Sequence, residues 1–91
     1  MKPYSILYWV GNGCPVCGEG CLAIIKDMKT NTFSIMCDDC DAEWREPNIS
    51  EETRLPRDIE HGKIKNATLE EIKELGWDGY IQGNYVDYHC I

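Results

Sequence analysis

Cysteines are the residues of this 91-residue chain with the clearest capacity for chemistry. Four of its six cysteines form two Cys-x-x-Cys pairs, Cys14 with Cys17 and Cys37 with Cys40, and 19 residues lie between the pairs. Two intervening residues let a tight turn direct both thiols of a pair at one ion, and a hairpin between the pairs returns the second turn to the same point. This spacing predicts a tetrahedral four-thiolate site that holds one structural Zn²⁺.

The stretch "CPVCG…FSIMCDDCDAEW" resembles a zinc ribbon, in which a knuckle, a β-hairpin, a second knuckle and a strand with an aromatic residue follow one another. The resemblance covers residues 11–46. In that family a glycine often follows the second cysteine of each knuckle, a pattern that Gly18 fits and Asp41 does not. Because aspartate adopts the glycine conformation less readily, we expect a slightly altered second knuckle with its metal site intact. We expect Trp44 to shield the metal cluster from water.

Two other uses of the paired thiols remain to be weighed. The ribbon also resembles rubredoxin, where similar knuckles hold iron for electron transfer; rubredoxins typically have a wider gap between the pairs, which favours zinc here. A thioredoxin-like redox pair normally precedes a helix in a βαβ unit, whereas a strand and a second pair follow Cys14 and Cys17. The sequence therefore favours zinc and leaves iron as the alternative.

The two remaining cysteines, Cys21 and Cys90, are expected to pack as small apolar residues. Cys21 offers an alternative to Cys17 as a ligand, but its three-residue spacer makes a poorer knuckle. Six cysteines would also suit a secreted disulfide scaffold. The N-terminal stretch lacks a signal-peptide cleavage site, and no apolar run approaches the length of a membrane span. We therefore expect a cytoplasmic protein without a membrane segment.

The elements that must position the thiols form a single α+β domain over residues 1–91. Strands are predicted at residues 4–10, 22–28 and 32–37, with a further short strand around "AEWRE". The second and third strands form the hairpin between the knuckles, and Asn31 is expected in a left-handed turn conformation. Residues 11–46 make the zinc-ribbon portion, and residues 47–67 are expected to form an ordered connector.

The clearest helix of the sequence is predicted at residues 68–75. Thr68 is the expected N-cap, Glu71 completes a capping box, and Gly76 stands where a helix terminator belongs. A helix this short does not persist unaided, so it must pack on the rest of the domain. A final strand, within residues 68–91, is expected to pack on it. The expected apolar stripe of the helix is Leu69, Ile72 and Leu75.

No arrangement of residues in the sequence points to catalysis. Structural metal sites have four protein ligands, whereas catalytic sites keep one position open, and here all four expected positions are taken by cysteines. The sequence contains no His-Glu-x-x-His motif, no phosphate-binding loop and no recognisable nucleophile with a base. We therefore expect a protein that is not an enzyme.

The net negative charge of the chain indicates which kind of partner it binds. Its formal charge is −7, and four thiolates with one Zn²⁺ would make it −9. Residues 38–52 contain seven acidic residues and a single basic one, Arg45. Such a surface repels phosphate backbones and attracts basic proteins, although acidity also serves solubility alone. We therefore expect a partner with a basic surface and argue against nucleic acid.

In general character the chain is similar to small acidic bacterial immunity proteins and antitoxins, which neutralise basic nuclease toxins by covering their active sites. Together with the cysteine spacing, that likeness implies a zinc-binding protein that acts by protein–protein interaction, as an immunity-type inhibitor of a basic, nuclease-like toxin. The alternatives are a nucleic-acid-binding zinc ribbon, or accessory protein of transcription or translation, and a rubredoxin-like electron carrier. Two candidate aromatic residues at the interface would also serve to close the core behind the helix. The candidate partner-binding residues are Asp38, Asp39, Asp41, Glu43, Trp77 and Tyr80.

Overall fold

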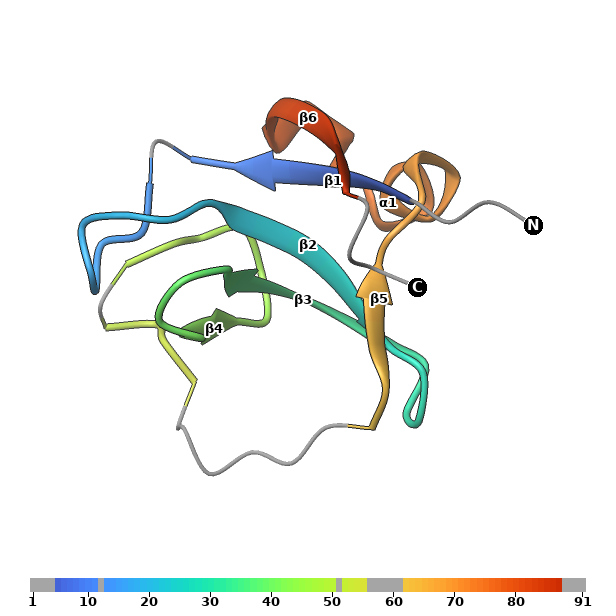
Figure 1. The fold of residues 1–91 in the computed structure, drawn as a ribbon. Helices are drawn as coiled ribbons and strands as arrows, with labels where there is room; N and C mark the ends of the chain where they lie inside the picture. Colours follow the sequence, from blue (N-terminus) through green and yellow to red (C-terminus); the bar gives the residue numbers. More distant parts are fainter. Residues whose placement is uncertain (1–4, 12, 51, 56–61, 88–91) are drawn as a thin grey trace.

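The computed structural model describes residues 5–11, 13–50, 52–55 and 62–87 (Figure 1). Within these ranges the chain folds as an antiparallel sheet with one short α-helix, which confirms the α+β class. No helix in these ranges is long and apolar enough to cross a membrane. The elements are β1 (Ser5–Val10), β2 (Leu22–Asp27), β3 (Thr32–Cys37), β4 (Glu43–Trp44), β5 (Ile64–Asn66), α1 (Leu69–Leu75), the 3-10 helix η1 (Asp78–Tyr80) and β6 (Ile81–Asp87).

The β2–β3 hairpin is the centre of the fold. Its register runs from Leu22 opposite Cys37 to Asp27 opposite Thr32, so one end of the hairpin adjoins both knuckles. At the other end Asn31 takes the left-handed conformation expected of it, with φ 59°, and donates its N–H to the Asp27 carbonyl at 2.8 Å. Strand β4 extends the sheet by pairing with β3. The predicted hairpin is therefore confirmed.

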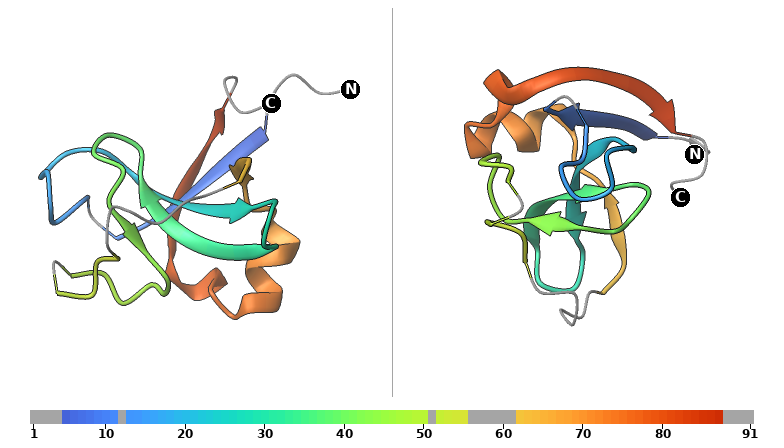
Figure 2. Two further views of the ribbon diagram at one scale, coloured as in Figure 1. Left: turned by 90° about the horizontal axis from the view of Figure 1, so that it is seen from below. Right: turned by 90° about the vertical axis from the view of Figure 1, so that its left-hand side faces the viewer.

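The second edge of β2 is divided between two strands. β1 pairs with its beginning, where Trp9 lies opposite Ala23, and β5 pairs with its end, where Asn66 lies opposite Ile25. β1 then leaves β2 and forms a long ribbon with β6, and Figure 2 shows this ribbon crossing over the hairpin. The sheet thus bends around the core and gives it walls on more than one side.

Alternation along β2 separates two apolar clusters. Ala23 and Ile25 point to one side, where they pack with Leu7 of β1. Leu22 and Ile24 point to the other side and belong to the larger cluster, as expected for strand geometry. The larger cluster contains Val10, Cys14, Leu22, Ile24, Ile35, Cys37, Ala42, Trp44, Ala67 and Ile72.

Helix α1 has the ends that the sequence predicts. The Thr68 hydroxyl accepts the Glu71 N–H at 3.2 Å, and the Glu71 carboxylate accepts the Thr68 N–H at 3.0 Å. Gly76 follows with φ 78° and donates to the last turn of the helix. Only Ile72 of the predicted apolar stripe is fully buried; Leu69 and Leu75 remain 37% and 36% exposed. The helix is therefore anchored to the core by a single side chain of its stripe.

Two expectations about the second half of the chain differ from the structure. The last strand, β6, pairs with β1 instead of relying on the helix for its contacts. The segment expected as a connector, residues 47–67, includes β5, which pairs with β2. Both strands complete hydrogen bonds on partners far away in sequence, which local patterns do not reveal. Cys90 lies outside the described residues.

Candidate metal centre

Two loops bring the predicted ligands together. Cys14 and Cys17 lie in the loop between β1 and β2, and Cys37 and Cys40 lie where β3 turns into β4. These loops meet at the same end of the β2–β3 hairpin (Figure 2), and the four Sγ atoms all lie within 4.8 Å of one another. The structure therefore gathers the four cysteines as the spacing predicted.

The separations between sulfurs fit a metal ion. The Sγ atoms of Cys14 and Cys40 are 3.6 Å apart, and those of Cys17 and Cys37 are 3.7 Å apart. A tetrahedron with metal–sulfur bonds of about 2.3 Å has edges of about 3.8 Å, whereas a disulfide needs about 2.05 Å. Each close pair joins one knuckle to the other, as a shared ion requires. The arrangement thus suits a metal held by four thiolates and not two disulfides.

Backbone N–H groups of each knuckle point at a ligand sulfur. The Val16 N–H donates to Cys14 Sγ at 3.4 Å, and the Asp39 N–H donates to Cys37 Sγ at the same distance. Donors at these places stabilise thiolate charge on the sulfurs. The residue after the second cysteine is left-handed in both knuckles, with φ 73° at Gly18 and 62° at Asp41. Asp41 therefore departs from the family pattern in residue type and not in this backbone angle.

The centre is buried on one side and partly exposed on the other. Cys14 and Cys37 are buried at 3% and 0% exposure and belong to the larger apolar cluster, whereas Cys17 and Cys40 are partly exposed. Trp44 is also fully buried in that cluster. The tryptophan therefore shares a buried cluster with two of the ligands, and its Nε1–H is satisfied by the Ser50 carbonyl at 2.7 Å.

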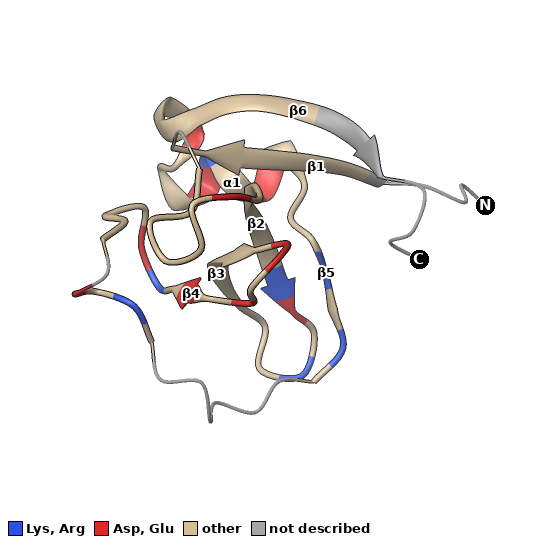
Figure 3. Ribbon diagram, turned by 60° about the vertical axis from the view of Figure 1, so that its left-hand side comes forward, with Lys and Arg blue, Asp and Glu red and all other residues tan. Residues whose placement is uncertain are grey.

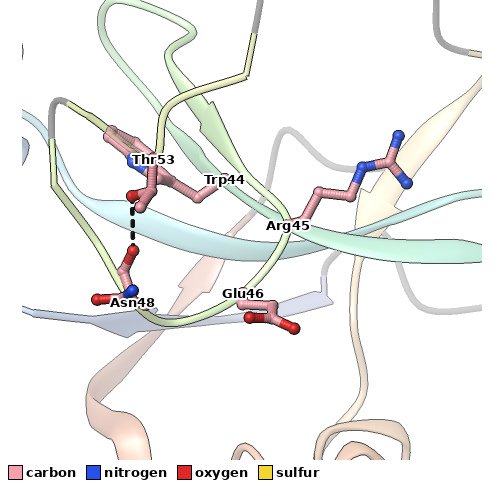
Figure 4. Close-up of a pocket in the computed structure, with 5 residues that line it drawn as sticks. All are labelled: Trp44, Arg45, Glu46, Asn48 and Thr53. Carbon is pink, nitrogen blue, oxygen red and sulfur yellow. Dashed lines mark hydrogen bonds between the residues drawn. The ribbon is translucent and has the colours of Figure 1, made fainter.

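A small hollow of about 120 Å³ lies beside Trp44 (Figure 4). Thr53 closes part of it by donating its hydroxyl to the Asn48 carbonyl at 2.7 Å, and the exposed Arg45 and Glu46 form its rim. These hydrogen bonds fold the loop after β4 over the edge of the tryptophan ring. The hollow therefore lies between Trp44 and the loop that follows β4.

The thiol of Cys17 resists ionisation when no metal is bound. A backbone hydrogen bond at Glu19 lowers its pKa, but burial and hydrogen bonds to the three other thiols raise it, and the resulting pKa is about 12. Four adjacent thiolates without a cation would repel one another strongly. A divalent ion would remove that repulsion and displace the thiol protons, so metal binding and proton release are coupled at this site.

Cys21 lies beside the centre without joining it. The four-sulfur group consists of Cys14, Cys17, Cys37 and Cys40. Cys21 is instead partly exposed, with its backbone N–H donating to Asp38 Oδ1 at 2.8 Å. Burial, followed by the nearby charges of Asp38 and Cys37, raises the pKa of the Cys21 thiol. The structure therefore favours Cys17 over Cys21 as the ligand, in agreement with the spacing argument.

The predicted partner-binding residues fall into different environments. Asp38, Asp39 and Asp41 are exposed on the second knuckle. Glu43 is buried at 8% exposure, so it does not belong to an exposed acidic face. It sits in β4 beside Trp44, and pairing with β3 draws both residues inward. The acidic run in the sequence gave no sign of this burial, because a two-residue strand is too short for an alternating pattern.

The two predicted aromatic residues also separate. Trp77 is partly buried and packs against the larger apolar cluster. This agrees with the alternative expectation that it closes the core behind the helix. Tyr80, in η1, is 52% exposed. The structure therefore leaves Tyr80 available at the surface and gives Trp77 a role in packing.

Sequence reasoning overlooked two residues close to the centre. Glu19 is exposed between the knuckles, and its carbonyl accepts a hydrogen bond from the Cys17 thiol at 3.0 Å. Gly20 has φ 78°, and a Cβ there would lie 2.9 Å from Cys37 Sγ and 2.8 Å from Asp38 Oδ1. The available signal was the glycine-rich spelling "CGEGC", which indicates a backbone that must pass close to its neighbours.

Charge is unevenly distributed over the molecule (Figure 3). Residues 13–25 and 37–44, which contain both knuckles, have no lysine and no arginine. Toward the opposite end of the β2–β3 hairpin, lysines lie on β2, on the turn after it, just before β5 and on β5. They are Lys26, Lys29, Lys63 and Lys65. The metal centre therefore lies at an acidic end of the molecule, and we use "acidic end" for Glu19, Asp38, Asp39 and Asp41.

Comparison with known proteins identifies no relative of this chain: no family model, no curated protein and no solved structure matches it. The resemblance to zinc ribbons consequently depends on the two knuckles, the hairpin and the four sulfurs described above. These features support a small metal-binding protein.

Proposed function

We propose that this protein binds one structural Zn²⁺ and acts by binding a protein with a basic surface through its acidic end. The placement of the charges carries the proposal. The exposed carboxylates of the acidic end belong to the two loops that contain the four cysteines, and no basic residue of either knuckle opposes them. A zinc ion with four thiolates would add a net charge of −2 at the same place. Charge of one sign on one face steers a partner of the opposite sign toward it.

An immunity-type role is the specific form of this proposal. An inhibitor of a basic nuclease must present a compact acidic surface to the site where that enzyme binds phosphate, and it needs no chemistry of its own. With zinc bound, the four cysteines would fill every coordination position, so the ion would shape the knuckles and leave no position for a substrate. The role proposed is therefore one of binding and not of catalysis.

Nucleic-acid binding is the second candidate, and the lysine-rich end of the hairpin is the observation that favours it. Lys29 and Lys63 are exposed there. Lys26, however, is engaged by Glu71 at 2.8 Å. Nucleic acid bound at this end would depend steeply on salt. The absence of binding to a DNA duplex or a single-stranded RNA at low salt would remove this candidate.

Capture of partners from host lysate by two charge-matched triple variants tests the proposal. The first variant neutralises the second knuckle through Asp38→Asn, Asp39→Asn and Asp41→Asn. The control removes the same charge from exposed positions elsewhere, through Glu70→Gln, Glu74→Gln and Asp78→Asn. We expect wild type and control to retain a basic protein, identified by mass spectrometry. The knuckle variant should retain at least tenfold less of that protein than wild type.

Two results would contradict the proposal. One is equal retention of the basic protein by both triple variants. The other concerns the metal: purified protein that contains iron and absorbs visible light would point to the electron carrier instead. We expect a colourless protein with one zinc per chain by elemental analysis.

A further inference from the structure

An open hollow of about 460 Å³ lies between the first knuckle and the β1–β6 ribbon. Glycines with positive φ form much of its wall, so backbone and not side chains borders the space. A β-bulge supplies another wall: Trp9 pairs with Gly83 and Val10 with Ile81, which leaves Gln82 as the extra residue. The residues that line the hollow are Trp9, Gly11, Gly13, Gly20, Cys21 and Gln82.

Trp9 gives the hollow an aromatic wall in a fixed position. Its indole lies across the facing strand at Gly83, where an added Cβ would come within 2.9 Å of Trp9 Cε2. The ring also packs against the smaller apolar cluster, yet the residue is only partly buried. A rigid aromatic group with one accessible side is a suitable surface on which a flat cation can stack.

Negative charge lies directly behind the opposite wall. Asp38 Oδ1 is 2.8 Å from the backbone nitrogen of Cys21, and the Cβ position of Gly20 is 2.8 Å from the same oxygen. That Cβ position is also 2.9 Å from Cys37 Sγ, one of the four centre sulfurs. None of the six lining residues carries a formal charge of its own. The hollow therefore combines an aromatic wall with a negative charge directly behind the opposite wall.

From this combination we infer that the hollow receives an arginine side chain of the basic partner. A planar guanidinium stacks on the indole of Trp9 while the charge of Asp38 behind the opposite wall attracts it, and it is more easily desolvated than an ammonium. A phosphate or a carboxylate would meet the negative wall and be repelled. The inference extends the proposed function, since it takes from it that the partner is a basic protein.

Titration of the zinc-loaded, ¹⁵N-labelled protein with the peptide acetyl-Gly-Arg-Gly-amide tests the inference by NMR. We expect saturable shifts of the amides of Gly11, Gly13, Gly20 and Cys21 and of the indole N–H of Trp9. The lysine peptide should bind more weakly, and the citrulline peptide, which has the same shape without charge, should leave these signals in place. Equal shifts with citrulline would overturn the role of the cation.

Variants of Gln82, which is exposed, provide a matched pair of opposite charge. Gln82→Arg places a guanidinium in the hollow and should weaken peptide binding at least threefold, whereas Gln82→Glu should strengthen it. Trp9→Ala should weaken it about two- to fivefold, as expected for a cation–π contact, and Trp9→Phe by less. The reverse order for the Gln82 pair would overturn the inference even if the Trp9 variants fold poorly.

The same variants separate this inference from the proposed function. If the neutralised second knuckle loses the basic partner while Gln82→Arg changes neither peptide shifts nor partner capture, the hollow is not the arginine site and the acidic end still binds. If the arginine peptide occupies the hollow but the neutralised knuckle captures partner as wild type does, the proposed function fails and the hollow remains a cation site.

Discussion

Gly18 and Asp41 occupy equivalent places in the two knuckles, each directly after the second cysteine. Both are left-handed, at φ 73° and 62°. Glycine adopts this conformation without cost, whereas a residue with a Cβ meets its own carbonyl there. Aspartate tolerates the region better than most residues because its short side chain bonds locally. The second knuckle therefore keeps its shape at a small cost in free energy, borne by Asp41 alone.

Replacing Asp41 by glycine should relieve that cost. We expect Asp41→Gly to raise the free energy of unfolding of the metal-loaded protein by about 0.5–1 kcal/mol, measured by denaturant titration. Asp41→Asn is the control, because it removes the same charge and tolerates the left-handed conformation similarly. An equal gain from both variants would assign the effect to charge repulsion with the neighbouring aspartates and contradict the conformational explanation.

At the scale of elements, the features that depend on neighbouring residues were predictable from the sequence, and those that depend on distant residues were not. Thr68, Glu71 and Gly76 define both ends of helix α1 as predicted, because a capping box and a left-handed terminator are encoded within a few residues. The division of the β2 edge between β1 and β5 was not predictable, since it depends on pairings between residues about 14 and 41 positions apart. The ion pair of Glu71 with Lys26 was missed for the same reason.

Glu71 connects the cap of α1 to the sheet. Its carboxylate accepts from the Lys26 ammonium at 2.8 Å, and the same ammonium lies 5.5 Å from the centre of the Phe33 ring. The hydrogen bond from Lys26, and next the backbone N–H of Thr68, hold the pKa of Glu71 below its usual value. A lowered folded-state pKa means that Glu71 stabilises the fold above the unfolded-state pKa, and that this stabilisation is lost as pH falls through the folded-state pKa.

Glu71→Gln should therefore change stability in a pH-dependent way. At pH 7 we expect the variant to be less stable than wild type by about 0.5–1 kcal/mol, a difference that shrinks below about pH 4.5 and vanishes as the carboxyl protonates. Taking the difference between the two proteins at each pH removes the acid sensitivity of the metal centre, which they share. Glu70→Gln, at an exposed neighbouring position, should show no such trend. A difference that stays constant down to pH 3 would contradict the linkage.

At the scale of the whole molecule, the metal centre and the apolar core are one structure. Cys14 and Cys37 belong to the same buried cluster as Trp44 and Ile72, so two of the ligands share one core with residues of β4 and α1. The spacing of the cysteines predicted the centre because four ligands must reach one point. It did not predict that Glu43 would be buried in β4, nor that glycines and Trp9 would border a hollow, since those features arise only when distant strands meet.

A chain of 91 residues with this shared core should depend on its metal for folding. Structural zinc contributes about 10–16 kcal/mol in peptides of this kind, which matches or exceeds the whole stability of a small domain. We expect a strong chelator, or Cys37→Ser, to abolish the cooperative thermal transition and to reduce the strand signal in circular dichroism. Cys21→Ser is the matched control: it removes a thiol outside the four-sulfur group and should retain one zinc with the transition in place. An unchanged melting temperature in Cys37→Ser, or loss of zinc from Cys21→Ser, would show that the four sulfurs do not hold the two knuckles together.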